Sequence, residues 1–87
     1  MIKIINLIQT CFACPTQFSG ETDDGREAYI RFRFGRLSIT IDGESIFSES
    51  LSDGLDGVIS YDKIKEATKH LNIQWPDKYS IKQYELE

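Results

Sequence analysis

Two cysteines separated by two residues, Cys11-Phe12-Ala13-Cys14, have the spacing in this sequence most suggestive of chemistry. A C-x-x-C pair supplies two of the four ligands of a structural zinc site, or the two thiols of a redox couple. The only other plausible zinc ligand is His70, so one copy of the chain is a ligand short. Free cysteine is also commonly buried as a small apolar residue. We favour two reduced thiols over the metal and redox interpretations, and we expect no cofactor.

No group of residues has the spacing of a catalytic site. His70 has no serine or cysteine partner that spacing would reveal, and a histidine late in a helix is explained by the helix dipole. The segment 53–57 lacks the ligand spacing of a calcium-binding EF-hand, and there is no glycine-rich phosphate loop. We therefore expect a protein that is not an enzyme. Four carboxylates adjoin glycines and are explained by turns: Asp23, Asp24, Asp53 and Asp56.

Arg31 and Arg33 alternate with apolar residues, in a stretch where Tyr29 falls on the same face as the arginines. Arginine binds carboxylate or phosphate with two parallel hydrogen bonds, and arginine and tyrosine are common at interface hot spots. Arginines beside aromatic rings also suit single-stranded nucleic acid. These three residues are thus candidates for partner binding. In the purely structural alternative, the arginines pair across strands with acidic neighbours, namely Glu21, Glu27 and Asp42.

Charge is unevenly distributed along the chain. The formal net charge is −4, yet all four arginines lie between residues 26 and 36. Such a protein repels nucleic acid at long range, so protein contact is favoured over nucleic-acid contact. Residues 42–59 contain five acidic residues and no basic one. Together with Phe47, these five form a second candidate binding surface: Asp42, Glu44, Glu49, Asp53 and Asp56.

The stretch 29–41 predicts a β-hairpin. A two-residue turn at Gly35-Arg36 supplies a positive φ and pairs Phe34 with Leu37, Phe32 with Ile39 and Ile30 with Ile41. One face of the hairpin is then wholly apolar and faces the core. The other face carries Arg33 beside Ser38, Arg31 beside Thr40, and Tyr29 beside Asp42.

Two further turns extend this hairpin into a meander. A three-residue loop, Asp23-Asp24-Gly25, pairs Thr22 with Arg26 and brings Phe18 opposite Ile30 on the apolar face. A two-residue turn at Asp42-Gly43 leads into a strand over about 44–48. In that register Ile46 lies opposite Ile39 in the core. Phe47 then falls on the arginine side, either over the arginine stems or as an exposed contact.

The two ends of the chain are less strongly patterned. Residues 1–10 suit a helix or a strand, and their isoleucines favour the strand. A helix is predicted over Tyr61 to Leu71, with Ser60 or Asp62 as N-cap and an apolar stripe of Ile64, Ala67 and Leu71. Residues 78–87 alternate apolar and polar types and predict a late edge strand.

Together these elements predict one small α+β domain spanning residues 1–87. It is an antiparallel meander of four to five strands with one helix packed on its apolar face. No run approaches the roughly 20 apolar residues of a membrane span, and the N-terminus lacks a signal-peptide cleavage site. We expect a cytoplasmic protein.

Two motifs resemble those of a group of short bacterial and prophage proteins. Residues 14–20 read C-P-x-Q-aromatic-x-G, and residues 24–37 read D-G-R-x-x-Y-x-R-aromatic-R-x-G-x-L. The resemblance covers about residues 14–38. It implies a microbial or phage origin and carries no assigned activity, so no functional residue is transferred.

The function we expect is that of a small acidic protein that binds and blocks a macromolecular partner. An immunity protein, or a phage-coded inhibitor of a host defence nuclease in the manner of an anti-CRISPR protein, has this size and charge. The alternative is a nucleic-acid-binding module that uses the arginine and aromatic face of the 29–41 hairpin. Association of two copies of the chain is left open.

Overall fold

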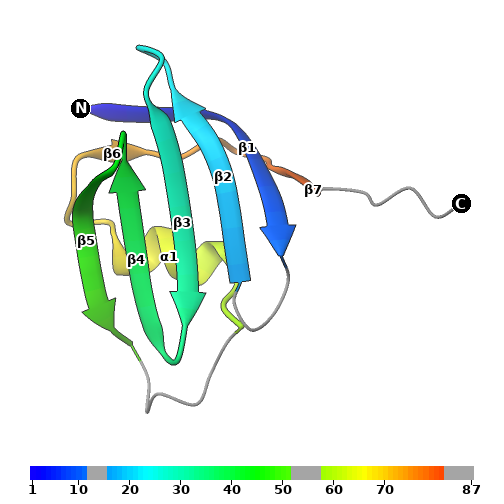
Figure 1. The fold of residues 1–87 in the computed structure, drawn as a ribbon, viewed down its shortest axis with the longest axis vertical. Helices are drawn as coiled ribbons and strands as arrows, with labels where there is room; N and C mark the ends of the chain where they lie inside the picture. The colour runs from blue at the N-terminus through cyan, green and yellow to red at the C-terminus, as the bar shows by residue number, and fades with distance from the viewer. Residues whose placement is uncertain (12–15, 52–57, 82–87) are drawn as a thin grey trace, which may run out of the picture.

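The structure is a computed structural model, and it describes residues 1–11, 16–51 and 58–81. The strands are β1 (Ile2–Cys11), β2 (Thr16–Thr22), β3 (Glu27–Arg33), β4 (Arg36–Ile41), β5 (Glu44–Ser50), β6 (Ile73–Gln74) and β7 (Ser80–Ile81). The helix is α1 (Tyr61–Ala67), which lies across one face of the sheet (Figure 1). The expected α+β class, with one helix over the apolar face, is confirmed.

The sheet is mixed rather than the simple antiparallel meander that we expected. Its order is β5-β4-β3-β2-β1-β6, with β7 also paired to β1. Strands β1 to β5 pair antiparallel in sequence, whereas β6 and β7 run parallel to β1. β6 and β7 have only two residues each, too few for an alternating pattern. They form where the chain returning from α1 passes along β1.

β1 confirms the strand interpretation of the N-terminus and bends in its middle. Its pairing with β2 shifts by one residue between Ile5 and Ile8, and Asn6 there has a φ of 52°. A bulge of this kind bends the strand that contains it. Figure 1 shows β1 turning at this point, so that its first half meets β6 and its second half meets β7.

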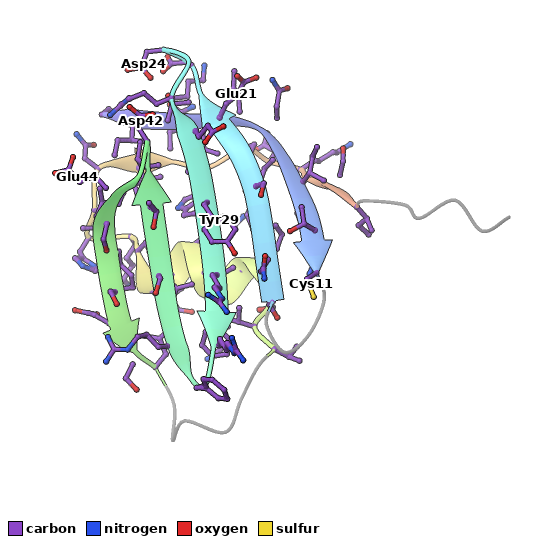
Figure 2. The ribbon with its side chains drawn as sticks, in the orientation of Figure 1. Cys11, Glu21, Asp24, Tyr29, Asp42 and Glu44 are labelled. Carbon is purple, nitrogen blue, oxygen red and sulfur yellow. The ribbon has the colours of Figure 1, made fainter. Side chains whose placement is uncertain are left out.

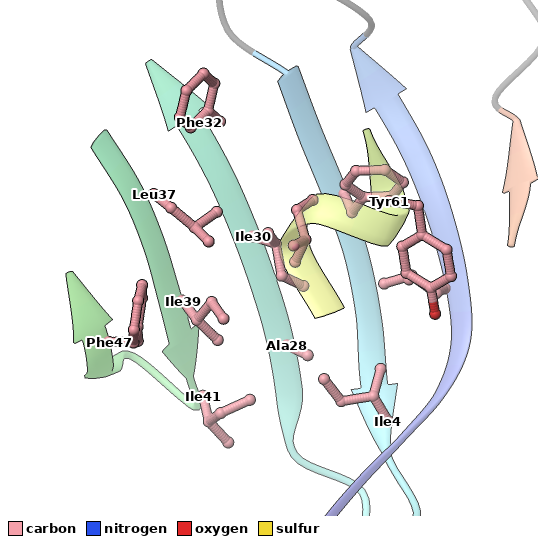
Figure 3. Close-up of a cluster of buried hydrophobic side chains, with 12 residues drawn as sticks. Ile4, Ala28, Ile30, Phe32, Leu37, Ile39, Ile41, Phe47 and Tyr61 are labelled. Atoms are coloured by element: carbon pink, nitrogen blue, oxygen red, sulfur yellow. The ribbon is translucent and has the colours of Figure 1, made fainter. Parts of the chain in front are cut away.

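The core lies between the sheet and α1. Because alternate residues of β3 and β4 are buried, each strand contributes one apolar face. The resulting cluster, most of which is drawn in Figure 3, contains Ile4, Leu7, Phe18, Ala28, Ile30, Phe32, Leu37, Ile39, Ile41, Phe47, Tyr61 and Ile64. Phe18 lies opposite Ile30, as predicted from the three-residue Asp23-Asp24-Gly25 loop.

The β3–β4 turn lies one residue earlier than predicted. Its two central residues are Phe34 and Gly35, with φ of 53° and 75°, and Phe32 pairs with Leu37. The faces of both strands are kept, because moving a two-residue turn by one position moves each partner by two residues. Phe34, however, leaves the core and is 65% exposed.

A bulge between β4 and β5 reverses the predicted roles of two neighbouring residues. Ile39 pairs with Phe47 and Thr40 with Ser45, so Ile46 is the extra residue. Phe47 is consequently 6% exposed and belongs to the core. Both interpretations of Phe47, as a cover for the arginine stems and as an exposed contact, are wrong.

α1 starts as predicted and ends earlier. Ser60 is the N-cap, and its hydroxyl accepts a hydrogen bond from the Lys63 amide at 3.2 Å. The helix ends at Ala67 instead of Leu71. There Thr68 donates its hydroxyl to the Ile64 carbonyl at 2.9 Å and accepts the Trp75 indole N–H at 3.1 Å. Within the described ranges, no helix is both long and apolar enough to cross a membrane.

Candidate binding surface

The face of the sheet opposite α1 is not covered by any other described segment. We call it the open face; Figure 2 views it directly, with α1 behind. In the central strand β3, the side chains at alternate positions point outward and are wholly or partly exposed. The outward residues of β2 to β4 are Gln17, Ser19, Glu21, Glu27, Tyr29, Arg31, Arg33, Arg36, Ser38 and Thr40.

The charges on the open face are separated into two poles. The basic pole, at the β3–β4 turn, consists of Arg31, Arg33 and Arg36. The acidic pole lies at the opposite end of the strands, where the β2–β3 and β4–β5 turns bring Glu21, Asp23, Asp24, Glu27, Asp42 and Glu44. In Figure 2 the labelled members Glu21, Asp24, Asp42 and Glu44 lie at this end and Tyr29 lies between the poles. Along β3, Glu27 and Arg33 are roughly 20 Å apart at ~3.3 Å per residue.

Like charges face each other across strands at both poles. Glu21 pairs directly with Glu27, and Arg33 pairs directly with Arg36. Such pairs destabilise a sheet, whereas opposite charges at the same positions would stabilise it. Folding therefore does not explain this arrangement.

The structural alternative for the arginines is not what the structure shows. The ion pairs among the described residues are Arg26–Asp24 and Lys65–Asp62, and neither involves the basic pole. Glu21 instead accepts a hydrogen bond from the Asn6 amide group at 2.6 Å. Arg31 and Arg33 thus have no carboxylate partner in the described part of the chain.

The three arginines line a shallow cavity of about 280 Å³ together with Phe34 and Ser38. We call it the arginine pocket. The guanidinium carbon of Arg33 lies 4.7 Å from the centroid of the Phe34 ring, within the range of a cation–π contact. Nη1 of Arg36 donates to the Ser48 carbonyl at 3.3 Å and to its hydroxyl at 3.2 Å. Nε of Arg31 is buried and has no hydrogen-bond partner among the described residues.

Phe34 presents an aromatic ring at the rim of this pocket in an unfavourable backbone conformation. A φ of 53° is rare for a bulky residue, and glycine or asparagine is the usual choice at such a turn position. Backbone strain of this kind is concentrated at functional sites. Further along the open face, Tyr29 is 37% exposed and donates its hydroxyl to Oε1 of Gln17 at 2.8 Å.

The structure brings only some of the predicted partner-binding residues together on one face. Tyr29, Arg31 and Arg33 lie together on the open face, and Asp42 lies at its acidic pole. Glu44 lies at the same end of the strands, but it pairs with the inward-facing Ile41. Glu49 is exposed on β5 opposite the inward-facing Leu37, so it does not join them. Asp53 and Asp56 lie outside the described residues, as does Cys14. Arg36, Ser38 and Phe34 complete the pocket and were not predicted.

The described residues contain no group of three or more potential metal ligands. Cys11, at the end of β1, is half-buried, and the second cysteine of the pair is the undescribed Cys14. The zinc and redox interpretations of this pair therefore stay predictions.

A larger cavity of about 500 Å³ lies on the other side of the sheet, between Phe32 and the α1 residues Lys63 and Ala67. Leu51 and Val58 also line it, and these residues flank the undescribed segment 52–57. Its walls are largely apolar, and it lacks the convergence of like charges seen in the arginine pocket.

Asp24, at the acidic pole, gives a testable pH dependence. A hydrogen bond from the Thr22 hydroxyl, and then one from Arg26, hold the pKa of this carboxyl below its usual value. The ionised Asp24 carboxylate therefore stabilises the fold above its unfolded-state pKa, and this stabilisation is lost as pH falls through its lower folded-state pKa. We expect wild type to be more stable than Asp24→Asn at pH 7 and the difference to vanish in acid. Urea unfolding at several pH values measures this.

The matched control for that measurement is Asp23→Asn, which removes the same charge one residue away. Its side chain is exposed and makes no hydrogen bond with the described residues. An equal pH-dependent difference for both variants would contradict the assigned role of the Thr22 and Arg26 contacts.

Comparison of the chain with protein-family models, with curated proteins and with solved structures finds no match.

Proposed function

We propose that this protein is a non-enzymatic binding protein that uses its open face to bind and block a macromolecular partner, and that the partner is a protein. The observation that carries the proposal is the arrangement of like charges directly opposite each other at both poles. This arrangement opposes folding, and a partner with complementary charges compensates it on binding.

The composition of the open face supports a protein partner. Arginine and tyrosine are enriched among the residues that dominate binding energy, and Arg31, Arg33 and Tyr29 lie side by side along β3. The two poles of opposite sign favour a partner that itself carries both charges. A nucleic acid would be attracted at one pole and repelled at the other.

An enzyme that handles nucleic acid is the class of partner that best fits the charges. Its substrate groove is basic, and the acidic pole would occupy that groove in place of phosphates. The basic pole would contact acidic groups beside it. This matches an immunity protein or a phage-coded inhibitor of a host nuclease, which is the specific form of the proposal.

Affinity capture from the native host, followed by titration of charge variants, tests the proposal. We expect Arg31→Ala/Arg33→Ala to weaken partner binding at least ~30-fold, because the loss of even one hot-spot arginine costs about 2 kcal/mol, a factor of roughly 30. Asp42→Asn/Glu44→Gln is expected to slow association mainly, with the effect reduced at high salt.

The matched control is Lys63→Ala/Lys69→Ala, which removes two positive charges from exposed positions of α1 and the following turn, away from the open face. It should change the dissociation constant by no more than about twofold. A control variant that weakens binding as much as the arginine variant would contradict the proposed surface.

Nucleic-acid binding is the second candidate, and the exposed Phe34 ring beside the arginines favours it. A mobility-shift titration with single- and double-stranded DNA and RNA across salt separates the two functions. Micromolar, salt-sensitive binding that is lost in Arg31→Ala/Arg33→Ala would overturn the protein-partner proposal.

A further inference from the structure

We propose that the arginine pocket is a binding site for a phosphate monoester dianion. This site chemistry goes beyond the proposed function and does not depend on it, because the pocket is complete within one chain. Its walls are Arg31, Arg33, Arg36, Ser38 and Phe34, all from β3, β4 and the turn between them.

The charge of the pocket selects the class of ligand. Three arginine side chains line one cavity, and no described carboxylate pairs with any of them. A single carboxylate would leave two formal positive charges uncompensated, whereas a phosphate monoester carries up to two negative charges near neutral pH. Arginine also matches phosphate oxygens with paired N–H donors, and the Ser38 hydroxyl adds another donor.

The unmet hydrogen-bonding capacity of the pocket supports a bound acceptor. The Nε–H of Arg31 is buried without a partner among the described residues, so an acceptor reaches it only when the guanidinium rotates toward the pocket; gaining that acceptor would remove an unfavourable unpaired donor. Arg36 uses Nη1 for Ser48 and keeps its other N–H groups for a ligand. Arg31 pairs with Ser38 and Arg33 with Arg36, and because these pairs lie on either side of the inward-facing Phe32–Leu37 pair, the hairpin presents all four side chains on the same face.

The size of the pocket and the Phe34 ring indicate what carries the phosphate. A cavity of about 280 Å³ is much larger than the roughly 30 Å³ occupied by one water molecule, so it holds a phosphate and part of the group attached to it. One face of the Phe34 ring is covered by Arg33, and the ring is 65% exposed. A planar group attached to the phosphate would stack there, as in a nucleoside monophosphate.

NMR titration of the full chain tests the site, because the Nε–H groups of arginine give their own ¹H–¹⁵N signals. The probes are inorganic phosphate, phosphoserine and a nucleoside 5′-monophosphate, each against sodium chloride at equal ionic strength. We expect saturable shifts of the Arg31 Nε–H and Ser38 amide signals with the phosphates and not with chloride. Absence of saturable shifts with every phosphate, or equal shifts with chloride, would overturn the proposal.

Variants locate the binding. Arg31→Gln and Arg36→Gln should each weaken phosphate binding about tenfold or more, since each removes a charge-assisted hydrogen bond. Arg26→Gln is the control, because Arg26 forms an ion pair with Asp24 at the other pole. This variant should leave the affinity for phosphate unchanged. Unchanged core amide signals verify folding in all three. Equal loss in Arg26→Gln, or no loss in the pocket variants, would overturn the assignment.

The probes also separate the sources of the phosphate. Tighter binding of the nucleoside monophosphate, with the advantage removed by Phe34→Asn, supports stacking on the ring. Equal binding of the three probes supports recognition of the phosphate group alone. If phosphate fails to bind while Arg31→Ala/Arg33→Ala still weakens partner capture, the phosphate site is wrong and the proposed function stands. If phosphate binds but Arg31→Ala/Arg33→Ala leaves partner capture unchanged, the proposed function is wrong and the phosphate site stands.

Discussion

Phe18→Ala is expected to lower the free energy of unfolding by about 3–5 kcal/mol, the range for removing a fully buried phenylalanine. Phe18 is 1% exposed and lies opposite Ile30 in the centre of the sheet. Its ring centroid is 5.9 Å from that of Tyr61 on α1 and 5.1 Å from that of Tyr79, just before β7. Because this one ring connects the sheet, the helix and the C-terminal segment, its loss leaves a cavity that no neighbouring element can fill alone.

The free energy of unfolding is measured by urea denaturation followed by circular dichroism, with the slope checked for two-state behaviour. Phe34→Ala is the matched control, since it deletes the same side chain from an exposed turn. That variant should change stability by less than about 0.5 kcal/mol, the usual limit for surface substitutions. Comparable destabilisation by both variants would mean that Phe34 lies in the core, as the Gly35-Arg36 turn predicted from the sequence requires.

Phe47→Ala is expected to be the second large loss, also about 3–5 kcal/mol. The β4–β5 bulge turns Phe47 into the core, where it pairs with Ile39 and its ring centroid lies 6.0 Å from that of His70. Ile46→Ala is the comparison, because Ile46 is the extra residue of the bulge and is half-buried. We expect it to cost no more than about half as much.

The ranking of these two variants distinguishes the bulged register from a regular one. In a regular hairpin Ile46 would face Ile39 in the core and Phe47 would lie on the open face. A larger loss for Ile46→Ala than for Phe47→Ala, measured by the same urea denaturation, would contradict the bulge. Each variant is compared with wild type under one set of conditions.

Turns that require a particular residue were predictable from the sequence. Gly25 has a φ of 87° and Gly43 a φ of 83°, and each follows an aspartate as turn chemistry requires. The β3–β4 turn was predicted one residue late because Gly35 can serve as the first or the second turn residue. The choice between these positions is made by the pairing of Ala28 with Ile41 and the other rungs of the sheet, which are not local.

The candidate site was predictable only in part, for a related reason. Alternation along β3 places Tyr29, Arg31 and Arg33 on one face, which is a property of any strand. Arg36 joins them only in the observed register, where it pairs with Arg33. Phe34 joins them because the turn excludes it from the core. Both depend on a register that the local sequence leaves undecided.

The sequence by itself determined which residues of strands β3 and β4 face inward, because alternation is local and survives a two-residue change of partner. It did not place Phe34, which the turn removes from the core. It also predicted the start of α1 at Tyr61, with Ser60 or Asp62 as N-cap, and Ser60 is the cap, through a hydrogen bond that spans three residues. Tertiary structure decided the parallel strands β6 and β7, the bulge that buries Phe47, and the two charged poles of the open face. These features depend on contacts between strands and between the sheet and α1. Such contacts form only in the complete fold, so no local stretch of sequence specifies them.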